Sequence, residues 1–122
     1  MLCVDNDASI LDGMDALLTQ WGVQTDKASG AAQARELYAR GDYQALLIDY
    51  HLGEGMDGLE LLHQLRQSRA NPPAAALITA DRSLELAQAA RAAGVPILHK
   101  PLRPAPLRAL LSALRTPNTT AA

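Results

Sequence analysis

The sequence predicts a single α/β domain in which five strands alternate with five helices. Two observations carry this prediction. Leu46, Leu47 and Ile48 form an unbroken apolar run, which is typical of a strand buried on both faces of a parallel sheet. Segments with a helical spacing of apolar residues separate this run from the other predicted strands. Such alternation requires right-handed crossover connections, so we expect a parallel sheet with helices on both faces.

The first half of the chain is predicted to contain three strands and two helices. The strands are expected at residues 1–4, 23–28 and 45–49. Ser9 is expected to cap the first helix, with Asp12 three residues later, and Gly22 closes it. The second helix begins at Ser29-Gly30 and stops at Gly41. The strand between these helices alternates only weakly, so we expect it at an edge of the sheet.

The second half is predicted to contain two strands and three helices. Asp57 can cap the third helix, and Glu60 stands three positions later as its partner in a capping box. The segment Asn71-Pro72-Pro73 then interrupts the chain. Pro104 begins the last helix, at a position where a first-turn proline is tolerated. Strands are predicted at 74–78 and 95–98, with the fourth helix at 84–93 between them.

Length and composition restrict the classes of function. A chain of 122 residues that is 48% apolar can build one core, and we expect residues 1–116 to form the domain and 117–122 a frayed tail. The net charge of −2 argues against a basic nucleic-acid-binding surface. The lone cysteine, Cys3, excludes an intramolecular disulfide, and we expect it to be a small buried hydrophobe in a reducing cytoplasm. No apolar run approaches the ~18 residues that suggest a membrane span.

Residues able to handle phosphate or a cation follow four of the five predicted strands. They are Asp5-Asn6-Asp7, Asp49, Thr79 and Lys100. Parallel strands end at the same edge of a sheet, so we expect these groups to meet there, with Asp49 as the reactive centre. Oxygen ligands of this kind suit Mg²⁺. Asp49 is therefore a candidate carboxylate nucleophile toward phosphorus, while Thr79 and Lys100 can bind phosphoryl oxygens.

Four motifs carry a family resemblance. They are Leu2-Cys3-Val4-Asp5-Asn6-Asp7, Leu47-Ile48-Asp49-Tyr50-His51-Leu52, Ile78-Thr79-Ala80-Asp81 and His99-Lys100-Pro101. In this order, and at the ends of predicted strands, they resemble a response-regulator receiver domain of two-component signalling over nearly all of the chain. The resemblance implies a flavodoxin-like (βα)5 three-layer sandwich with strand order 2-1-3-4-5. It also implies that the Lys100-Pro101 peptide bond is cis.

The same resemblance implies roles for the residues of the site. Asp49 would be the phosphoacceptor, and Thr79 and Lys100 would contact the phosphate. The Mg²⁺ ligands would be the side chains of Asp5, Asn6 and Asp49 and the backbone carbonyl of His51. The domain would take a phosphoryl group from a histidine kinase or a histidine phosphotransfer domain, and would assist its own phosphorylation and dephosphorylation.

Two residues depart from the family pattern. The family usually has a second acid where this chain has Asn6, and it often has an aromatic residue on the last strand where this chain has Ile97. An amide oxygen carries less charge than a carboxylate, so we expect weaker cation binding unless Asp7 compensates. The usual movement of an aromatic side chain together with Thr79 is not expected when that position is Ile97.

The sequences of these motifs are similar to those of receivers at the C-terminal end of hybrid sensor histidine kinases. Met1 leads directly into a strand, which fits excision from such a longer chain. We expect a cytoplasmic domain that itself contacts neither nucleic acid nor membrane. A homodimer is compatible with this interpretation.

Other interpretations stay open on the sequence alone. A haloacid-dehalogenase-type phosphatase would use Asp5 as its nucleophile, but the chain is short and gives Asp49 no role in that chemistry. A degenerate receiver would carry no phosphate and would act only as a binding module. Some residues also have simpler explanations: Asp7 is favoured at a helix start, and neither His51 nor His99 has the spacing of a zinc site.

Overall fold

A computed structural model describes residues 1–53 and 55–115. The expected domain boundary at residue 116 and the expected tail at 117–122 lie outside the described residues. Within them, strands and helices alternate as predicted. The elements are β1 (Leu2–Val4), α1 (Ala8–Gln20), β2 (Asp26–Ala28), α2 (Ala31–Arg40), β3 (Ala45–Asp49), α3 (Gly58–Gln67), β4 (Ala74–Thr79), α4 (Leu84–Ala92), β5 (Ile97–His99) and α5 (Pro104–Arg115).

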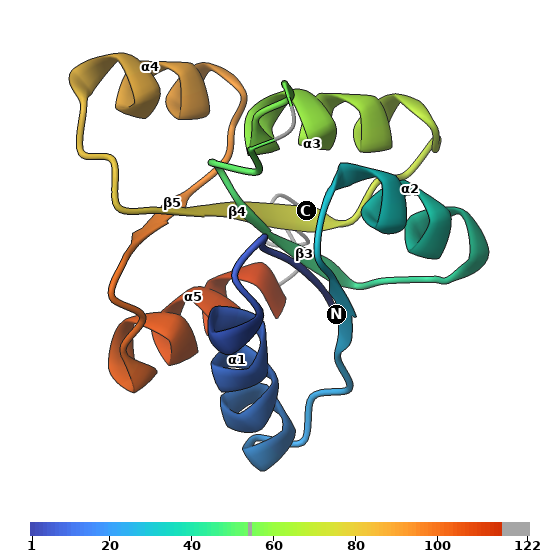
Figure 1. The fold of residues 1–122 in the computed structure, drawn as a ribbon, viewed down its shortest axis with the longest axis vertical. Helices are drawn as coiled ribbons and strands as arrows, with labels where there is room; N and C mark the ends of the chain where they lie inside the picture. The colour runs from blue at the N-terminus through green and yellow to red at the C-terminus, as the bar shows by residue number, and fades with distance from the viewer. Residues whose placement is uncertain (54, 116–122) are drawn as a thin grey trace, which may run out of the picture.

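The five strands form one parallel sheet in the order β2-β1-β3-β4-β5. Helices α2, α3 and α4 cover one face of this sheet, and α1 and α5 cover the other, so the domain has three layers (Figure 1). The predicted flavodoxin-like strand order is confirmed. Within residues 1–53 and 55–115, no helix has both the length and the apolar character that crossing a bilayer requires.

The core is divided by the sheet into two apolar clusters. On β3, Leu46 and Ile48 belong to the cluster that α2, α3 and α4 cover, whereas Leu47 belongs to the cluster against α1 and α5. The apolar run therefore fills both faces of the sheet, as its composition predicts. Cys3 lies in the second cluster and is fully buried, and this burial raises the pKa of its thiol to about 12. The expectation of a buried, unpaired Cys3 is confirmed.

The helix starts agree with the sequence in one case and not in another. Asp57 and Glu60 form the predicted capping box of α3, with hydrogen bonds of 2.8 and 3.0 Å between each side chain and the other residue's backbone nitrogen. The prediction that Ser9 caps α1 is wrong, because the N-cap is Asp7. The Asp7 carboxylate accepts hydrogen bonds from both the backbone nitrogen and the hydroxyl of Ser9, at 2.9 and 2.7 Å.

Two strands begin later than predicted because the residues expected to start them close the preceding helices. The backbone nitrogen of Val23 donates to the carbonyl of Leu18, and that of Val95 donates to the carbonyl of Ala90. Each valine therefore belongs to the closing turn of a helix, after a glycine with positive φ. Strand β2 begins at Asp26 as a result, and β5 occupies residues 97–99 rather than 95–98.

Tyr38 of α2 belongs to the apolar cluster that α2, α3 and α4 cover, and its hydroxyl is buried. Within the described residues, this hydroxyl has no hydrogen-bond partner. The guanidinium of Arg69 lies 4.2 Å from the centroid of the Tyr38 ring and donates to the backbone carbonyls of Tyr38 and Gly41. Arg69 thus closes the end of α2, while the Tyr38 hydroxyl is left unsatisfied.

Candidate functional site

Strand register brings the predicted acids together. Strands β1 and β3 pair with Val4 opposite Ile48, so Asp5 and Asp49 follow at the same level at the carboxyl edge of the sheet. Thr79, the last residue of β4, reaches the same edge. In the described part of the chain, these are the buried polar or charged residues, with exposed fractions of 0% for Asp5, 3% for Asp49 and 0% for Thr79. Burying such groups is costly unless they are hydrogen-bonded, paired with an opposite charge or bound to a metal.

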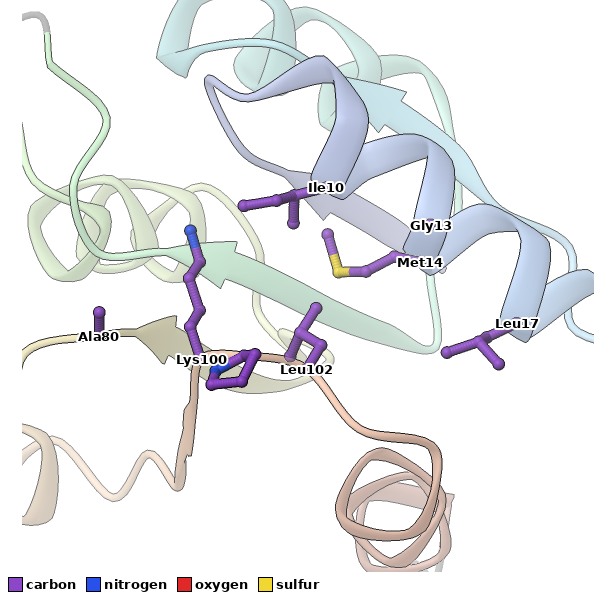
Figure 2. A pocket seen from close by; sticks show the side chains of 8 residues that line it. Ile10, Gly13, Met14, Leu17, Ala80, Lys100 and Leu102 are labelled. Carbon is purple, nitrogen blue, oxygen red and sulfur yellow. The ribbon is translucent and has the colours of Figure 1, made fainter.

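Lys100 completes the cluster from the end of β5. Its Nζ lies 3.1 Å from Oδ2 of Asp5 and 3.2 Å from Oδ1 of Asp49. Figure 2 shows the lysine side chain fully extended from the chain after β5. The Lys100-Pro101 peptide bond is cis, as the resemblance implies. The expectation that Lys100 meets Asp5 and Asp49 at this edge of the sheet agrees with these distances.

The electrostatics of the cluster favour an additional positive charge. Burial raises the pKa of Asp49, the nearby Asp5 carboxylate raises it further, and Lys100 opposes both effects. Burial disfavours the charged form of Lys100, but attraction to Asp5 and Asp49 outweighs it and raises the pKa of this lysine. Two carboxylates thus share one ammonium group. Oδ2 of Asp5 is buried as well, and the Lys100 ammonium at 3.1 Å is its ion-pair partner.

The other predicted cation ligands lie around this cluster. Asn6 is exposed, and a Cβ added to Gly53 in the β3–α3 loop would lie 3.3 Å from its side-chain nitrogen. The backbone nitrogen of Asp7 donates to Oδ1 of Asp5 at 2.9 Å, while the Asp7 side chain is used to cap α1. His51 is exposed, with Nε2 4.0 Å from Oδ2 of Asp81. In the chain outside Glu54 and residues 116–122, no three His, Cys, Asp or Glu side chains gather as a metal cluster.

Thr79 is connected by hydrogen bonds to the start of α4. Its hydroxyl oxygen accepts from the backbone nitrogen of Asp81 at 2.9 Å. The Asp81 carboxylate accepts from the backbone of Ser83 at 2.8 Å, which lowers the pKa of Asp81, and the Ser83 hydroxyl caps α4 by accepting from Leu86. The backbone nitrogen of Lys100 donates to the Thr79 carbonyl at 2.9 Å. The site is therefore coupled to both α4 and β5.

An apolar groove lies beside the buried cluster. Its lining comes from one face of α1 and from the chain after β4 and β5 (Figure 2). The lining residues are Ile10, Gly13, Met14, Leu17, Ala80, Lys100, Pro101 and Leu102. Lys100 thus belongs to the groove through its stem and to the charged cluster through its ammonium group.

Two features of the site were not predicted from the sequence. Gly58 packs directly against the backbone of Asp49, and Asp81 lies close to His51. The sequence shows that Gly58 follows the predicted helix cap Asp57, but nothing in it indicates which strand the start of this helix contacts. Asp81 follows a predicted strand in the sequence, but its contact with His51 depends on how two loops approach each other.

Comparison with known proteins identifies the family. Residues 1–112 match the family model described as the response regulator receiver domain. The chain belongs to this family. Its membership of the receiver family gives no support to the alternative of a haloacid-dehalogenase-type phosphatase. The fold, the strand order and the strand-end cluster described above agree with this assignment.

Curated relatives of this receiver domain are longer proteins. Response regulator protein PilR from Pseudomonas aeruginosa is 35% identical over 122 residues, which cover 98% of this chain and 27% of PilR. Sensory/regulatory protein RpfC from Xanthomonas campestris is 31% identical over 131 residues, covering 98% of this chain and 18% of RpfC. The chain therefore spans about a quarter or less of these two relatives.

Solved structures of receivers share the fold. A CheY-like receiver domain protein from Methanospirillum hungatei is 26% identical with a TM-score of 0.83, over 92% of this chain and 89% of that one. The receiver domain of NtrX from Brucella abortus is 26% identical with a TM-score of 0.81, over 97% of this chain and 98% of that one. These comparisons support the receiver topology along almost the whole chain.

Proposed function

We propose that this receiver domain accepts a phosphoryl group on Asp49 from the phosphohistidine of a histidine kinase or a histidine phosphotransfer domain. The observation that carries the proposal is the position of the Asp49 carboxylate, which is buried at a strand end and 3.2 Å from the Lys100 ammonium. A carboxylate held in this way is oriented for attack and faces a positive charge able to bind a phosphoryl oxygen.

The reaction is a transfer between two nucleophiles. One oxygen of Asp49 forms a bond to phosphorus as the phosphorus–nitrogen bond of the donor histidine breaks, and the bonding pair returns to the imidazole nitrogen. Lys100 pairs with an equatorial phosphoryl oxygen, and the Thr79 hydroxyl, whose oxygen accepts from the Asp81 nitrogen, donates its own proton to another. Catalysis by the domain consists of positioning and charge stabilisation rather than acid–base chemistry.

A divalent cation fits the same cluster. The two buried carboxylates outnumber the single ammonium group that lies 3.1 and 3.2 Å from them, so the cluster has room for further positive charge. Asp5, Asn6 and Asp49, together with the backbone carbonyl of His51, would hold Mg²⁺. When bound, Mg²⁺ supplies the positive charge that offsets the negative oxygens of the incoming phosphoryl group.

The groove beside Lys100 supports contact with a protein donor. It is mainly apolar and reaches the residue that faces Asp49, so a partner seated there would bring its histidine to the acid. We place the domain in the cytoplasm, either as part of a longer signalling chain such as a hybrid sensor histidine kinase or as part of a response regulator. The net charge of −2 supports our proposal that this domain does not itself bind nucleic acid.

A degenerate receiver that acts only as a binding module is the second candidate. Asn6 favours it, because an amide at this position gives the cation site less negative charge than a second acid. Ile97 also favours it, because this partly buried residue packs into the core beneath α2, α3 and α4 without an aromatic ring that could rotate. Both candidates are tested by the same experiment.

The test is labelling with radioactive acetyl phosphate in the presence of Mg²⁺. We expect the wild-type domain to incorporate one acid-stable, hydroxylamine-labile phosphoryl group, Asp49→Asn to incorporate none, and Asp5→Asn to incorporate it more slowly. Retention of the label by Asp49→Asn would refute the proposal. A wild-type domain that takes no label, and whose thermal midpoint does not respond to beryllofluoride with Mg²⁺, would establish the binding module instead.

A further inference from the structure

Gly58, the first residue of α3, lies directly against the backbone of Asp49. A Cβ added to Gly58 would overlap the carbonyl oxygen of Asp49 and would lie 2.9 Å from its carbonyl carbon. It would also lie 3.0 Å from Cγ2 of Ile48, on the same strand. Backbone atoms of a central strand cannot shift as a side chain can, so no side chain fits at this position without moving the helix or the strand.

This close approach is not a general property of glycines in the chain. At Gly13, Gly22, Gly55 and Gly94, the same added atom would meet nothing within 4 Å. The contact at Gly58 is also fixed by a hydrogen bond, because its backbone nitrogen donates to the carbonyl of Tyr50 at 2.7 Å. The missing side chain therefore allows a specific, hydrogen-bonded contact between the helix start and the end of β3.

The start of α3 is itself held in place. Asp57 and Glu60 form a reciprocal capping box around the first turn, and Gly58 lies between them. On the other side, the backbone nitrogen of Tyr50 donates to the carbonyl of Ile78 on β4 at 2.9 Å. The Asp49 peptide is thus enclosed between a capped helix turn and the neighbouring strand.

The position of the Asp49 carboxylate follows from the position of its backbone. Its Oδ1 must stay within reach of Lys100 Nζ, at 3.2 Å, while the Asp5 carboxylate lies alongside. Phosphoryl transfer depends on such placement, since a displacement of about 1 Å at a reacting group can reduce a rate on the order of a hundredfold. A helix turn pressed against the Asp49 carbonyl therefore sets the geometry of the nucleophile without touching the phosphoryl group.

We propose that Gly58 is a positioning residue for Asp49: its lack of a side chain lets α3 pack onto the Asp49 peptide and fix the carboxylate opposite Lys100. This inference rests on the proposed phosphoacceptor role of Asp49. The two can be tested separately: phosphorylation of the wild-type domain tests the role of Asp49, and comparison of the variants with the wild type tests the positioning by Gly58.

The test compares Gly58→Ala with two control variants. Gly41→Ala adds the same methyl group against the Tyr43 ring, 3.1 Å away, at the opposite edge of the sheet, and Leu65→Ala removes buried packing from the far part of α3. The rate of phosphorylation by acetyl phosphate and the Mg²⁺ affinity are measured at a temperature below the melting transition of the wild type and of every variant. We expect Gly58→Ala to lose at least tenfold in rate, and both controls to stay within about twofold of wild type despite their loss of stability.

Two results would overturn the inference. The first is a phosphorylation rate in Gly58→Ala equal to that of the wild type. The second is a loss of rate in Leu65→Ala as large as that in Gly58→Ala, because general destabilisation would then explain both losses. If Gly58→Ala does not fold, Asp57→Ala decides instead, because it loosens the helix start without adding an atom. We then expect a rate loss of about threefold relative to Leu65→Ala, and equal rates would refute the inference.

Should the wild-type domain take no phosphoryl group, a crystal structure of Gly58→Ala still tests the positioning. We expect the Asp49 carboxylate to move away from Lys100 Nζ relative to a wild-type crystal. An unchanged Asp49–Lys100 contact in that crystal would refute the role of Gly58 independently of the chemistry.

Discussion

Nζ of Lys100 lies 3.2 Å from Oδ1 of Asp49, although the strands that lead to these residues are not neighbours in the sheet. Strand β4 lies between β3 and β5, so the lysine reaches across the end of β4 to meet the acid. The contact is therefore formed only when β3, β4 and β5 are paired. Folding of the three strands and assembly of the charged cluster depend on each other.

Replacing Lys100 by methionine should destabilise the domain. Lys100→Met leaves Asp5 and Asp49 buried without their cation, and we expect a loss of about 3 kcal/mol in the free energy of unfolding, measured in urea at pH 7. The double variant Lys100→Met/Asp49→Asn should recover most of this loss, because one of the two buried charges is then removed. Additive effects of the two substitutions would contradict a direct interaction.

Replacing Asp49 by asparagine should stabilise the domain even though it removes the proposed phosphoacceptor. The amide avoids the cost of burying a second carboxylate beside Asp5 and can still accept from Lys100. We expect a gain on the order of 1 kcal/mol at pH 7 without Mg²⁺, measured by urea denaturation. A loss of stability would mean that the ion pair with Lys100 outweighs the repulsion.

The sign of the pH dependence of this gain follows from the raised pKa of Asp49. In the unfolded chain the carboxyl titrates near its ordinary value of 3.8, and in the folded domain its pKa is higher. Between the two values the folded state binds more protons, so its stability falls as pH rises through this window. The advantage of Asp49→Asn is thus complete above the folded pKa and should shrink as the pH is lowered toward 3.8. A gain that is independent of pH would contradict this account.

Replacing Asn6 by aspartate should strengthen cation binding. Asn6 is exposed next to the buried acids, so a carboxylate there adds negative charge to the site at little cost of burial. We expect Mg²⁺ affinity to rise on the order of fivefold, measured by titration of backbone amide signals. Asp12→Asn, on the exposed side of α1 where it pairs with Lys27, serves as a control for net charge and should leave the affinity unchanged. Equal affinities of wild type and Asn6→Asp would exclude Asn6 from the ligand set.

Two tyrosines should respond oppositely to removal of the hydroxyl. Tyr38→Phe removes a buried hydroxyl that has no hydrogen bond within the described residues, so we expect unchanged or higher stability, by up to about 1 kcal/mol. Tyr43→Phe removes a hydroxyl that donates to Asp26 at 2.6 Å, and should cost about 0.5–1 kcal/mol. Both are measured as free energies of unfolding, and a larger loss in Tyr38→Phe than in Tyr43→Phe would contradict the assignment.

The sequence was informative wherever a pattern is local or where topology follows from alternation. The apolar run at Leu46–Ile48 predicts the central strand, and the spacing of Asp57 and Glu60 predicts the capping box. A parallel sheet also predicts that Asp5, Asp49 and Lys100 lie close together, because the carboxyl ends of all its strands are at the same edge.

Predictions failed where two local signals competed or where a contact is tertiary. Asp7 and Ser9 are both good cap residues, and the outcome was decided by hydrogen bonds from Ser9 to the Asp7 carboxylate. The strand predicted from residue 95 starts at Ile97, because Val95 closes the preceding helix. The approach of Gly58 to Asp49 depends on how closely a helix packs on the sheet, which no spacing of residues encodes.

The burial of Cys3 has a practical consequence for experiments on this domain. Its thiol is fully enclosed between the sheet and α1, and its pKa is raised to about 12, so almost no reactive thiolate is present near neutral pH. Alkylating reagents should therefore leave the native chain unmodified while it stays folded. A cysteine introduced on the surface can be tagged with a fluorophore or spin label in the wild-type background, and distance changes can be followed without first removing the natural thiol.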